Sequence, residues 1–215
     1  KKENDLSRSI WINKNKVLNR GKGELLHIVT PSKWLAEQVK KSSLFGHLPI
    51  SIIPYGIDTD LFRPRDTLRF RESLNIPADA TIVGFVADAT GNKRKGFQYL
   101  KEAIEKIKNK NIYLISVGKS PAAMSKNINH IHLGNIQDDR QLSITYSLFD
   151  VYVCASVEDN LPNTVIESLA CGTPVVGFPI GGISDMVDSG LTGLLTTDVS
   201  SESLAKCINE IISDK

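Results

Sequence analysis

Residues 151–176, VYVCASVEDNLPNTVIESLACGTPVV, place two apolar runs on either side of a polar loop and a helix-like stretch. The first run begins at Val151, and the second follows Gly172. This order of patterns predicts a strand, a loop, a helix and a second strand. Units of this kind build parallel sheets that are covered by helices. The segment therefore predicts an α/β protein.

The same alternation runs through most of the chain. Residues 81–87, TIVGFVA, are nearly all apolar, as in a central parallel strand, and residues 97–107 carry apolar side chains at the spacing of an amphipathic helix. Further strands are expected at residues 112–117, 131–133, 151–154, 174–178 and 193–195, and further helices at residues 139–148, 162–170, 183–187 and 201–212. About six strands with intervening helices predict a Rossmann-like, doubly wound parallel sheet.

The helix predicted after the 151–154 strand is suited to bind an anion. Pro162 fits the first turn of a helix, because its missing N–H would have no partner there. The N–H groups of Asn163, Thr164 and Val165 would then be free. Free N–H groups and the helix dipole favour a negative ligand such as a phosphate, beyond the carboxyl end of the sheet.

Two carboxylates flank this predicted anion site, Asp159 before it and Glu167 after it. A carboxylate does not attract a phosphate, so these side chains are better suited to accept hydrogen bonds from the hydroxyls of a sugar or a ribose. The alternative is structural: Glu167 would be an exposed helix residue, and Asp159 a charge that keeps the loop in water.

A second candidate phosphate site is the segment DATGNKRKG, between the predicted strand at 81–87 and the next helix. Arg94 and Lys95 stand at the start of that helix, where the helix dipole disfavours cations. Two cations placed there would suit a diphosphate, and Gly96 would let the chain come close to it. The alternative is an ordinary solvated run of lysines.

The composition narrows the class of protein. The net charge of +2 gives no reason to expect nucleic acid as a partner, and the four histidines and three cysteines show no metal-ligand spacing. The odd number of cysteines predicts small core residues in a reducing compartment. No apolar run is long enough to span a membrane. No signal peptide is recognised, and the chain begins with Lys1 and not with Met, so we expect a piece of a longer protein.

The segment 159–176 resembles the C-terminal domain of GT-B-fold glycosyltransferases in the large retaining family often called family 4, or glycosyl transferases group 1. The family signature is Glu, seven residues, Glu, then Ala-x-Ala-x-Gly-x-Pro-Val. Here Asp159 stands in the first Glu position, Glu167 in the second, and SLACGTPV follows. Residues 53–58, IPYGID, resemble the family hinge Ile-Pro-Asn-Gly-Val-Asp, with Tyr55 in place of Asn.

The resemblance implies a division of the chain and a set of site residues. Residues 1–60 would be the trailing segment of an N-terminal acceptor domain with its hinge, and residues 61–215 the C-terminal nucleotide-sugar-binding domain. The catalytic residues implied are Asp159, Lys95 and Arg94, with Lys95 on the donor diphosphate. The donor-binding residues implied are Glu167 on the ribose, together with Asn163, Thr164, Leu161 and the backbone of Gly134, Asn135 and Ile136 at the base.

The activity implied is hexosyl transfer, with retention, from a UDP- or GDP-sugar to a glycan or lipid-linked acceptor in bacterial polysaccharide biosynthesis. No metal and no cofactor beyond the donor is implied, and the acceptor would bind through the N-terminal domain. The enzyme would be cytoplasmic, and the intact form could associate peripherally with the inner face of the membrane. The piece alone is expected to be inactive.

Other functions remain open for this fold. A sugar-nucleotide epimerase or a phosphorylase shares the GT-B architecture, and a non-catalytic nucleotide-sugar-binding module would need no transfer chemistry. A dinucleotide-binding enzyme is disfavoured, because no G-x-G-x-x-G follows the first strand of the sheet.

Overall fold

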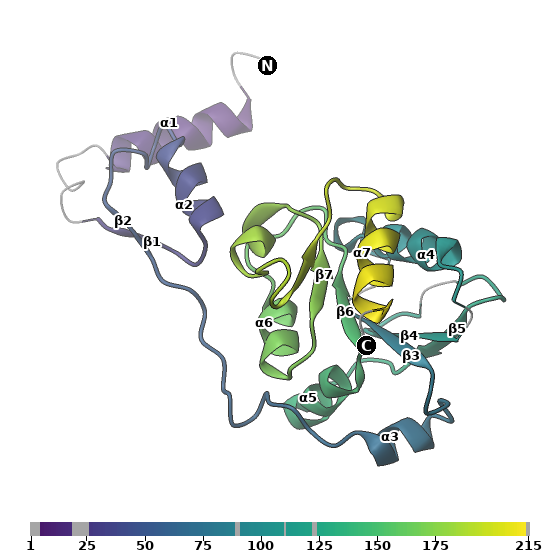
Figure 1. Ribbon diagram of the computed structural model, residues 1–215. Coiled ribbons are helices and arrows are strands. Elements are labelled where there is room, and N and C mark those ends of the chain that lie inside the picture. The colour runs from purple at the N-terminus through teal and green to yellow at the C-terminus, as the bar shows by residue number, and fades with distance from the viewer. Residues whose placement is uncertain (1–4, 19–25, 89–90, 110, 122–123, 214–215) are drawn as a thin grey trace. The chain divides into compact units, whose positions relative to one another are not determined.

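The computed structural model describes residues 5–18, 26–88, 91–109, 111–121 and 124–213 (Figure 1). Its contacts divide the chain into two units, Lys1–Tyr55 and Gly56–Lys215. The assignment of residues 1–60 to an acceptor domain stays a prediction.

The described residues of the first unit form one parallel strand pair and two helices. Its elements in chain order are α1 (Leu6–Leu18), β1 (Ile28–Thr30), α2 (Lys33–Lys40) and β2 (Ile50–Ile52). Ser32 caps α2, since its hydroxyl accepts a hydrogen bond from the Leu35 N–H at 3.0 Å. Val29 of β1 is 56% exposed, in a sheet that has two strands among the described residues.

The second unit has a sheet of six parallel strands in the order β5-β4-β3-β6-β7-β8. The strands are β3 (Thr81–Val86), β4 (Ile112–Val117), β5 (Asn129–His132), β6 (Val151–Cys154), β7 (Val175–Gly177) and β8 (Gly193–Leu195). The chain runs outward from β3 to β5, returns to β6 beside β3, and runs outward again to β8. This is the doubly wound sheet that the sequence predicts. Ligands of such sheets bind where the strand order reverses, which here is between β3 and β6.

Helices cover both faces of this sheet (Figure 1). The helices are α3 (Leu68–Ser73), α4 (Phe97–Lys106), α5 (Asp139–Leu148), α6 (Asn163–Ala170) and α7 (Ser201–Ser213). The helix expected at 183–187 is instead a 3₁₀ turn over Gly181–Asp185, whose last N–H groups bond three residues back, from Ile183 to Ile180 and from Met186 to Ile183. Within the described ranges, no helix is long and apolar enough to cross a membrane.

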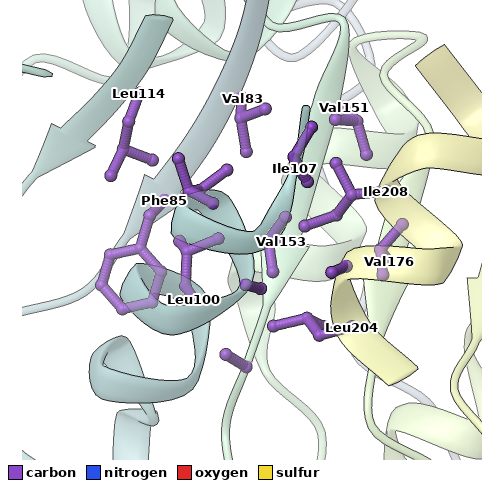
Figure 2. Close-up of a cluster of buried hydrophobic side chains, with 14 of the residues drawn as sticks. Val83, Phe85, Leu100, Ile107, Leu114, Val151, Val153, Val176, Leu204 and Ile208 are labelled. Carbon is purple, nitrogen blue, oxygen red and sulfur yellow. The ribbon is translucent and has the colours of Figure 1, made fainter. Parts of the chain in front are cut away.

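Each face of the sheet has its own core, because successive strand residues point to opposite faces. Figure 2 shows the face under α4 and α7, where Val83, Phe85, Leu114, Val151, Val153 and Val176 of the strands pack against Leu100, Ile107, Leu204 and Ile208. The opposite face carries Ile82, Ile115, Tyr152 and Val175 with Tyr146 and Val165 of α5 and α6. Two dry cores hold the strands in register, so the loops at their carboxyl ends start from fixed positions.

Candidate functional site

Three loops meet at the carboxyl ends of β3, β6 and β7. The loop after β6 is held between the other two by glycine contacts. A Cβ on Gly96 would overlap the carbonyl oxygen of Ala155, and a Cβ on Gly181 would overlap that of Asp159. Both glycines have positive φ, +69° and +54°, which side chains rarely adopt. The Val157 N–H also donates to the Arg94 carbonyl at 2.9 Å. Glycine at two positions therefore lets backbone pack on backbone around Asp159.

Lys95 and Asp159 form an ion pair in this packed region. The Lys95 Nζ lies 2.8 Å from the Asp159 Oδ2, and the two side chains are only 25% and 17% exposed. The structure thus joins two predicted site residues from different loops. A lysine ammonium has three donors, so it can hold Asp159 and still donate to another anion. Arg94 is close in the backbone, through its bond to Val157, while its side chain is exposed.

Helix α6 begins at Asn163, one residue later than predicted, because Pro162 is its N-cap and not its first helical residue. Pro162 keeps an extended backbone, with φ −67° and ψ 121°, and its carbonyl accepts a hydrogen bond from the Val165 N–H at 3.0 Å. The expectation that the Val165 N–H is free is therefore wrong, because the first turn closes on Pro162. Asn163 and Thr164 stay as the predicted donors of the first turn. Asn163 is exposed, Thr164 is half-buried and Leu161 is buried.

Glu167 lies one turn further along α6 and is half-buried, not exposed. The Tyr146 hydroxyl donates a hydrogen bond to its Oε2 at 2.8 Å. Burial raises the pKa of Glu167, while this hydrogen bond acts in the opposite direction. The alternative of an ordinary exposed helix residue is therefore wrong for Glu167.

Sequence reasoning missed two tyrosines under α6, Tyr146 of α5 and Tyr152 of β6. Tyr146 is fully buried and Tyr152 nearly so. A usable signal was present, since a tyrosine on the buried face of an element needs a polar partner for its hydroxyl. The pattern does not say which partner, because α5 and α6 meet only in the fold.

The predicted base-reading segment follows β5, on the same edge of the sheet. Gly134 has a φ of +72°, and its carbonyl accepts a hydrogen bond from the Gly118 N–H at 2.9 Å. Lys119, which follows Gly118 in the loop after β4, donates its N–H to the Asp88 carbonyl at 2.9 Å. These two bonds tie the loops after β5, β4 and β3 together. Asn135 is exposed and Ile136 half-buried.

The predicted site residues therefore form three groups along the carboxyl edge. The structure joins Lys95 to Asp159, places Glu167 with Asn163, Thr164 and Leu161 around α6, and sets Gly134, Asn135 and Ile136 after β5. Within the part of the chain that the structure describes, no hydrogen bond or ion pair joins Glu167 to Lys95 or Asp159. The arrangement offers cations, helix N–H groups and carboxylates along one edge, which suits an extended ligand with phosphates and hydroxyls.

Comparison with known proteins finds glycosyltransferases. A D-inositol 3-phosphate glycosyltransferase of Catenulispora acidiphila is 30% identical over 173 residues, which are 71% of this chain and 40% of that protein. TuaC of Bacillus subtilis, a protein named for teichuronic acid biosynthesis, is 28% identical over 196 residues, 90% of this chain and 48% of TuaC. The chain thus spans about half the length, or less, of the curated relatives it matches.

Solved structures of glycosyltransferases share the fold. Sucrose-phosphate synthase of Thermosynechococcus elongatus matches 99% of this chain and 54% of its own, with a TM-score of 0.78 and 27% identity. Anabaena HepE, solved with UDP and glucose, matches 97% of this chain and 58% of its own, with a TM-score of 0.77 and 21% identity. The Rossmann-like sheet is thereby that of GT-B glycosyltransferases. Residues 80–214 match the family described as Glycosyl transferases group 1. The chain belongs to the glycosyl transferases group 1 family.

Proposed function

We propose that this chain is mainly the donor-binding half of a retaining, family 4 type glycosyltransferase that uses a UDP- or GDP-sugar. The observation that carries the proposal is the Lys95–Asp159 ion pair between β3 and β6, where doubly wound sheets bind ligands. A cation for phosphates stands there beside a carboxylate for sugar hydroxyls. Membership of the family supports the same conclusion.

Lys95 would act on the leaving diphosphate. The negative charge on the diphosphate grows as the sugar leaves, so a fixed ammonium group stabilises the transition state more than the bound donor and contributes to the rate. Arg94 is the second cation proposed for this role, since it lies next to Lys95 in the same loop and its side chain is exposed. Asp159 would accept hydrogen bonds from the donor sugar's hydroxyls while it holds Lys95.

The remaining residues would bind the nucleotide. Glu167 would accept hydrogen bonds from the ribose hydroxyls, and the first turn of α6, at Asn163 and Thr164, would face the phosphates. Leu161 would pack beside them as a buried residue. The backbone after β5, from Gly134 through Ile136, would read the base.

The acceptor would be a glycan or a lipid-linked saccharide in bacterial polysaccharide biosynthesis, held through the domain to which residues 1–60 belong. Supporting observations are the UDP and glucose bound to HepE and the name of TuaC. We propose a cytoplasmic enzyme, with peripheral association at the inner face of the membrane, that needs no metal and no cofactor besides its donor.

Calorimetric titration of the chain with UDP, GDP and ADP tests the proposal. We expect one nucleoside diphosphate to bind selectively. Glu167→Ala should lose about 1 to 3 kcal/mol of binding free energy, the scale of a hydrogen bond to a charged group, and Lys95→Ala should lose a similar amount. Matched controls are Glu210→Ala on α7 and Lys126→Ala in the turn before β5, both at exposed positions.

Unchanged affinity in the two control variants with a loss in both site variants supports the donor site. Equal losses in Lys95→Ala and Lys126→Ala would show that only overall charge attracts the nucleotide. Unchanged affinity in Glu167→Ala would remove Glu167 from the site. No binding of any nucleoside diphosphate to the wild-type chain would contradict the proposal for this chain.

A further inference from the structure

Two buried tyrosines, Tyr146 and Tyr152, lie under α6, and the Tyr146 hydroxyl is directed to a residue of that helix. The rings of Tyr146 and Tyr152 pack edge to face with their centroids 5.7 Å apart. The Tyr146 hydroxyl donates a hydrogen bond to Glu167 Oε2 at 2.8 Å. Buried phenols need such partners, but a carboxylate on a partly exposed helix face has water as an alternative. The hydrogen bond between Tyr146 and Glu167 therefore restricts the orientation of the Glu167 carboxylate, which would otherwise be free to bind water.

The Tyr146 hydroxyl is a rigid donor. Its ring is fully buried and also packs edge to face on Phe149, at 5.9 Å between centroids. The carbonyl of Tyr146 accepts a hydrogen bond from the Thr173 hydroxyl at 2.7 Å, which ties the end of α5 to the segment before β7. A donor with these restraints fixes the position of the oxygen that it binds.

Only one oxygen of the Glu167 carboxylate is used in this way. The Tyr146 bond goes to Oε2, and among the described residues Oε1 has no hydrogen-bond partner. An ionised carboxylate has about four acceptor positions on its two oxygens. The second oxygen of Glu167, Oε1, therefore has a fixed direction, because rotation of the carboxylate would break the hydrogen bond from Tyr146.

We infer that Tyr146 is a positioning residue, which orients the Glu167 carboxylate so that its second oxygen accepts hydrogen bonds from the ribose of the nucleotide. The inference rests on the proposed function, because it assigns the geometry of the same donor site. Tyr146 itself touches no ligand in this arrangement, since it is fully buried beneath α6.

The charges around Glu167 determine how the pair responds to pH. Burial raises the pKa of Glu167, the Tyr146 hydrogen bond opposes this, and Asp139 of α5 raises the pKa further. Tyr152 and Cys171 also face the pair, and burial raises the pKa of both, so both stay neutral near pH 7. The charge of Arg65 acts on Cys171 in the opposite direction and lowers its pKa. Removal of the Tyr146 hydroxyl should therefore raise the pKa of Glu167.

Tyr146→Phe tests the inference, because it removes the hydroxyl and keeps the ring. We expect UDP, or GDP if that is the nucleotide bound, to bind about three- to tenfold more weakly, as for the loss of one hydrogen bond. The 2′,3′-dideoxy form of the same nucleotide should bind wild type and Tyr146→Phe with equal affinity, since it offers Glu167 no hydroxyl. Tyr113→Phe is the matched control, a half-buried tyrosine on β4.

The pH profile of binding gives a second readout. Ionised Glu167 is the form that accepts hydrogen bonds, so binding should fall as the pH drops through its pKa. In Tyr146→Phe this fall should begin at higher pH, because the bond that lowers the pKa is gone. In Glu167→Gln the part of the fall that Glu167 causes should disappear, while the part caused by protonation of the nucleotide's terminal phosphate should remain. This variant keeps the test available if Tyr146→Phe does not fold.

The outcomes separate the two proposals. Absence of nucleotide binding by wild type would contradict the proposed function itself. Wild-type binding with an unchanged affinity and pH profile in Tyr146→Phe would overturn the positioning role alone. An equal loss for the ribose and dideoxy nucleotides would also overturn it, because the hydroxyl would then serve only the stability of the site. A fall in binding at low pH that is identical in Glu167→Gln and wild type would also overturn the positioning role, because Glu167 would then not be the group whose ionisation matters.

Discussion

Gly181→Ala tests whether backbone packing holds Asp159 in place. Gly181 has a φ of +54°, and a Cβ on it would overlap the carbonyl oxygen of Asp159. The neighbouring Gly182 N–H also approaches that carbonyl, at 3.4 Å. The added methyl group must therefore strain its own backbone and displace the loop that carries Asp159.

A control glycine separates these two effects. Gly190 also has a positive φ, +88°, but a Cβ there would meet no atom of the described residues within 4 Å. Gly190→Ala should therefore cost only the backbone strain, about 1 to 2 kcal/mol. Gly181→Ala adds a clash with main-chain atoms, which costs typically another 1 to 3 kcal/mol. We expect a total of about 2 to 5 kcal/mol for Gly181→Ala.

Urea denaturation of both variants measures these costs, and nucleotide titration measures the site. Gly181→Ala should lose more stability than Gly190→Ala and should also bind the nucleoside diphosphate more weakly, while Gly190→Ala should bind it like wild type. Equal losses of stability with unaltered binding in both variants would refute the reasoning, because the contact between Gly181 and Asp159 would then contribute neither to stability nor to nucleotide binding.

Three further predictions concern the core, a thiol and the ion pair. Leu100→Ala removes a fully buried side chain and should lower the free energy of unfolding by about 2 to 5 kcal/mol. Leu191→Ala, at a residue that is 79% exposed, should change it by less than about 0.5 kcal/mol. Similar losses of stability in the two variants would place Leu100 outside the core. Burial raises the pKa of Cys154 to about 11, so its thiol should not react with iodoacetamide at pH 8 in the folded protein and should react only in urea. Mass spectrometry would measure the labelling, and rapid labelling without urea would contradict the burial of Cys154. A double-mutant cycle of Lys95→Met and Asp159→Asn should give a coupling of about 0.5 to 1 kcal/mol, since the pair is partly exposed, and a coupling near zero would mean that the two side chains do not act together.

Much of the fold follows from sequence patterns that are local. The predicted helix at 139–148 and the predicted strands at 151–154 and 193–195 have the observed bounds, because each apolar pattern ends at a clear turn signal. The strand count and the doubly wound arrangement follow from the alternation of these elements. The 3₁₀ turn at Gly181–Asp185 was predicted as a helix, since composition alone does not distinguish so short a turn from a helix start.

The residues proposed for the site stand out in the sequence, but the contacts among them do not. Spacing within one loop and one helix marks Asp159 and Glu167. The prediction that Arg94 and Lys95 stand at the start of a helix is wrong, because they lie in a 3₁₀ turn, Lys93–Lys95, and left-handed Gly96 separates this turn from α4. The bond from Tyr146 to Glu167 joins residues 21 positions apart on different helices, and the ion pair joins residues 64 positions apart, so no local pattern contains either. The hydrogen bond of the Val165 N–H depends on the backbone angles of Pro162, which the residue type restricts only in φ.

The departure of Asp159 from the family's Glu has a physical counterpart in the glycines around it. An aspartate reaches one methylene less far than a glutamate, so its carboxylate depends more on where its backbone lies. Here the loop that carries Asp159 is held between two other loops, by Gly96 at the Ala155 carbonyl and by Gly181 at the Asp159 carbonyl, and only residues without a Cβ allow these approaches. The Lys95 ammonium then sets the direction of the carboxylate at 2.8 Å. A short side chain on a fixed backbone loses less conformational entropy when it is ordered than a longer one would, so the glycine contacts of this loop favour a rigidly placed Asp159 carboxylate.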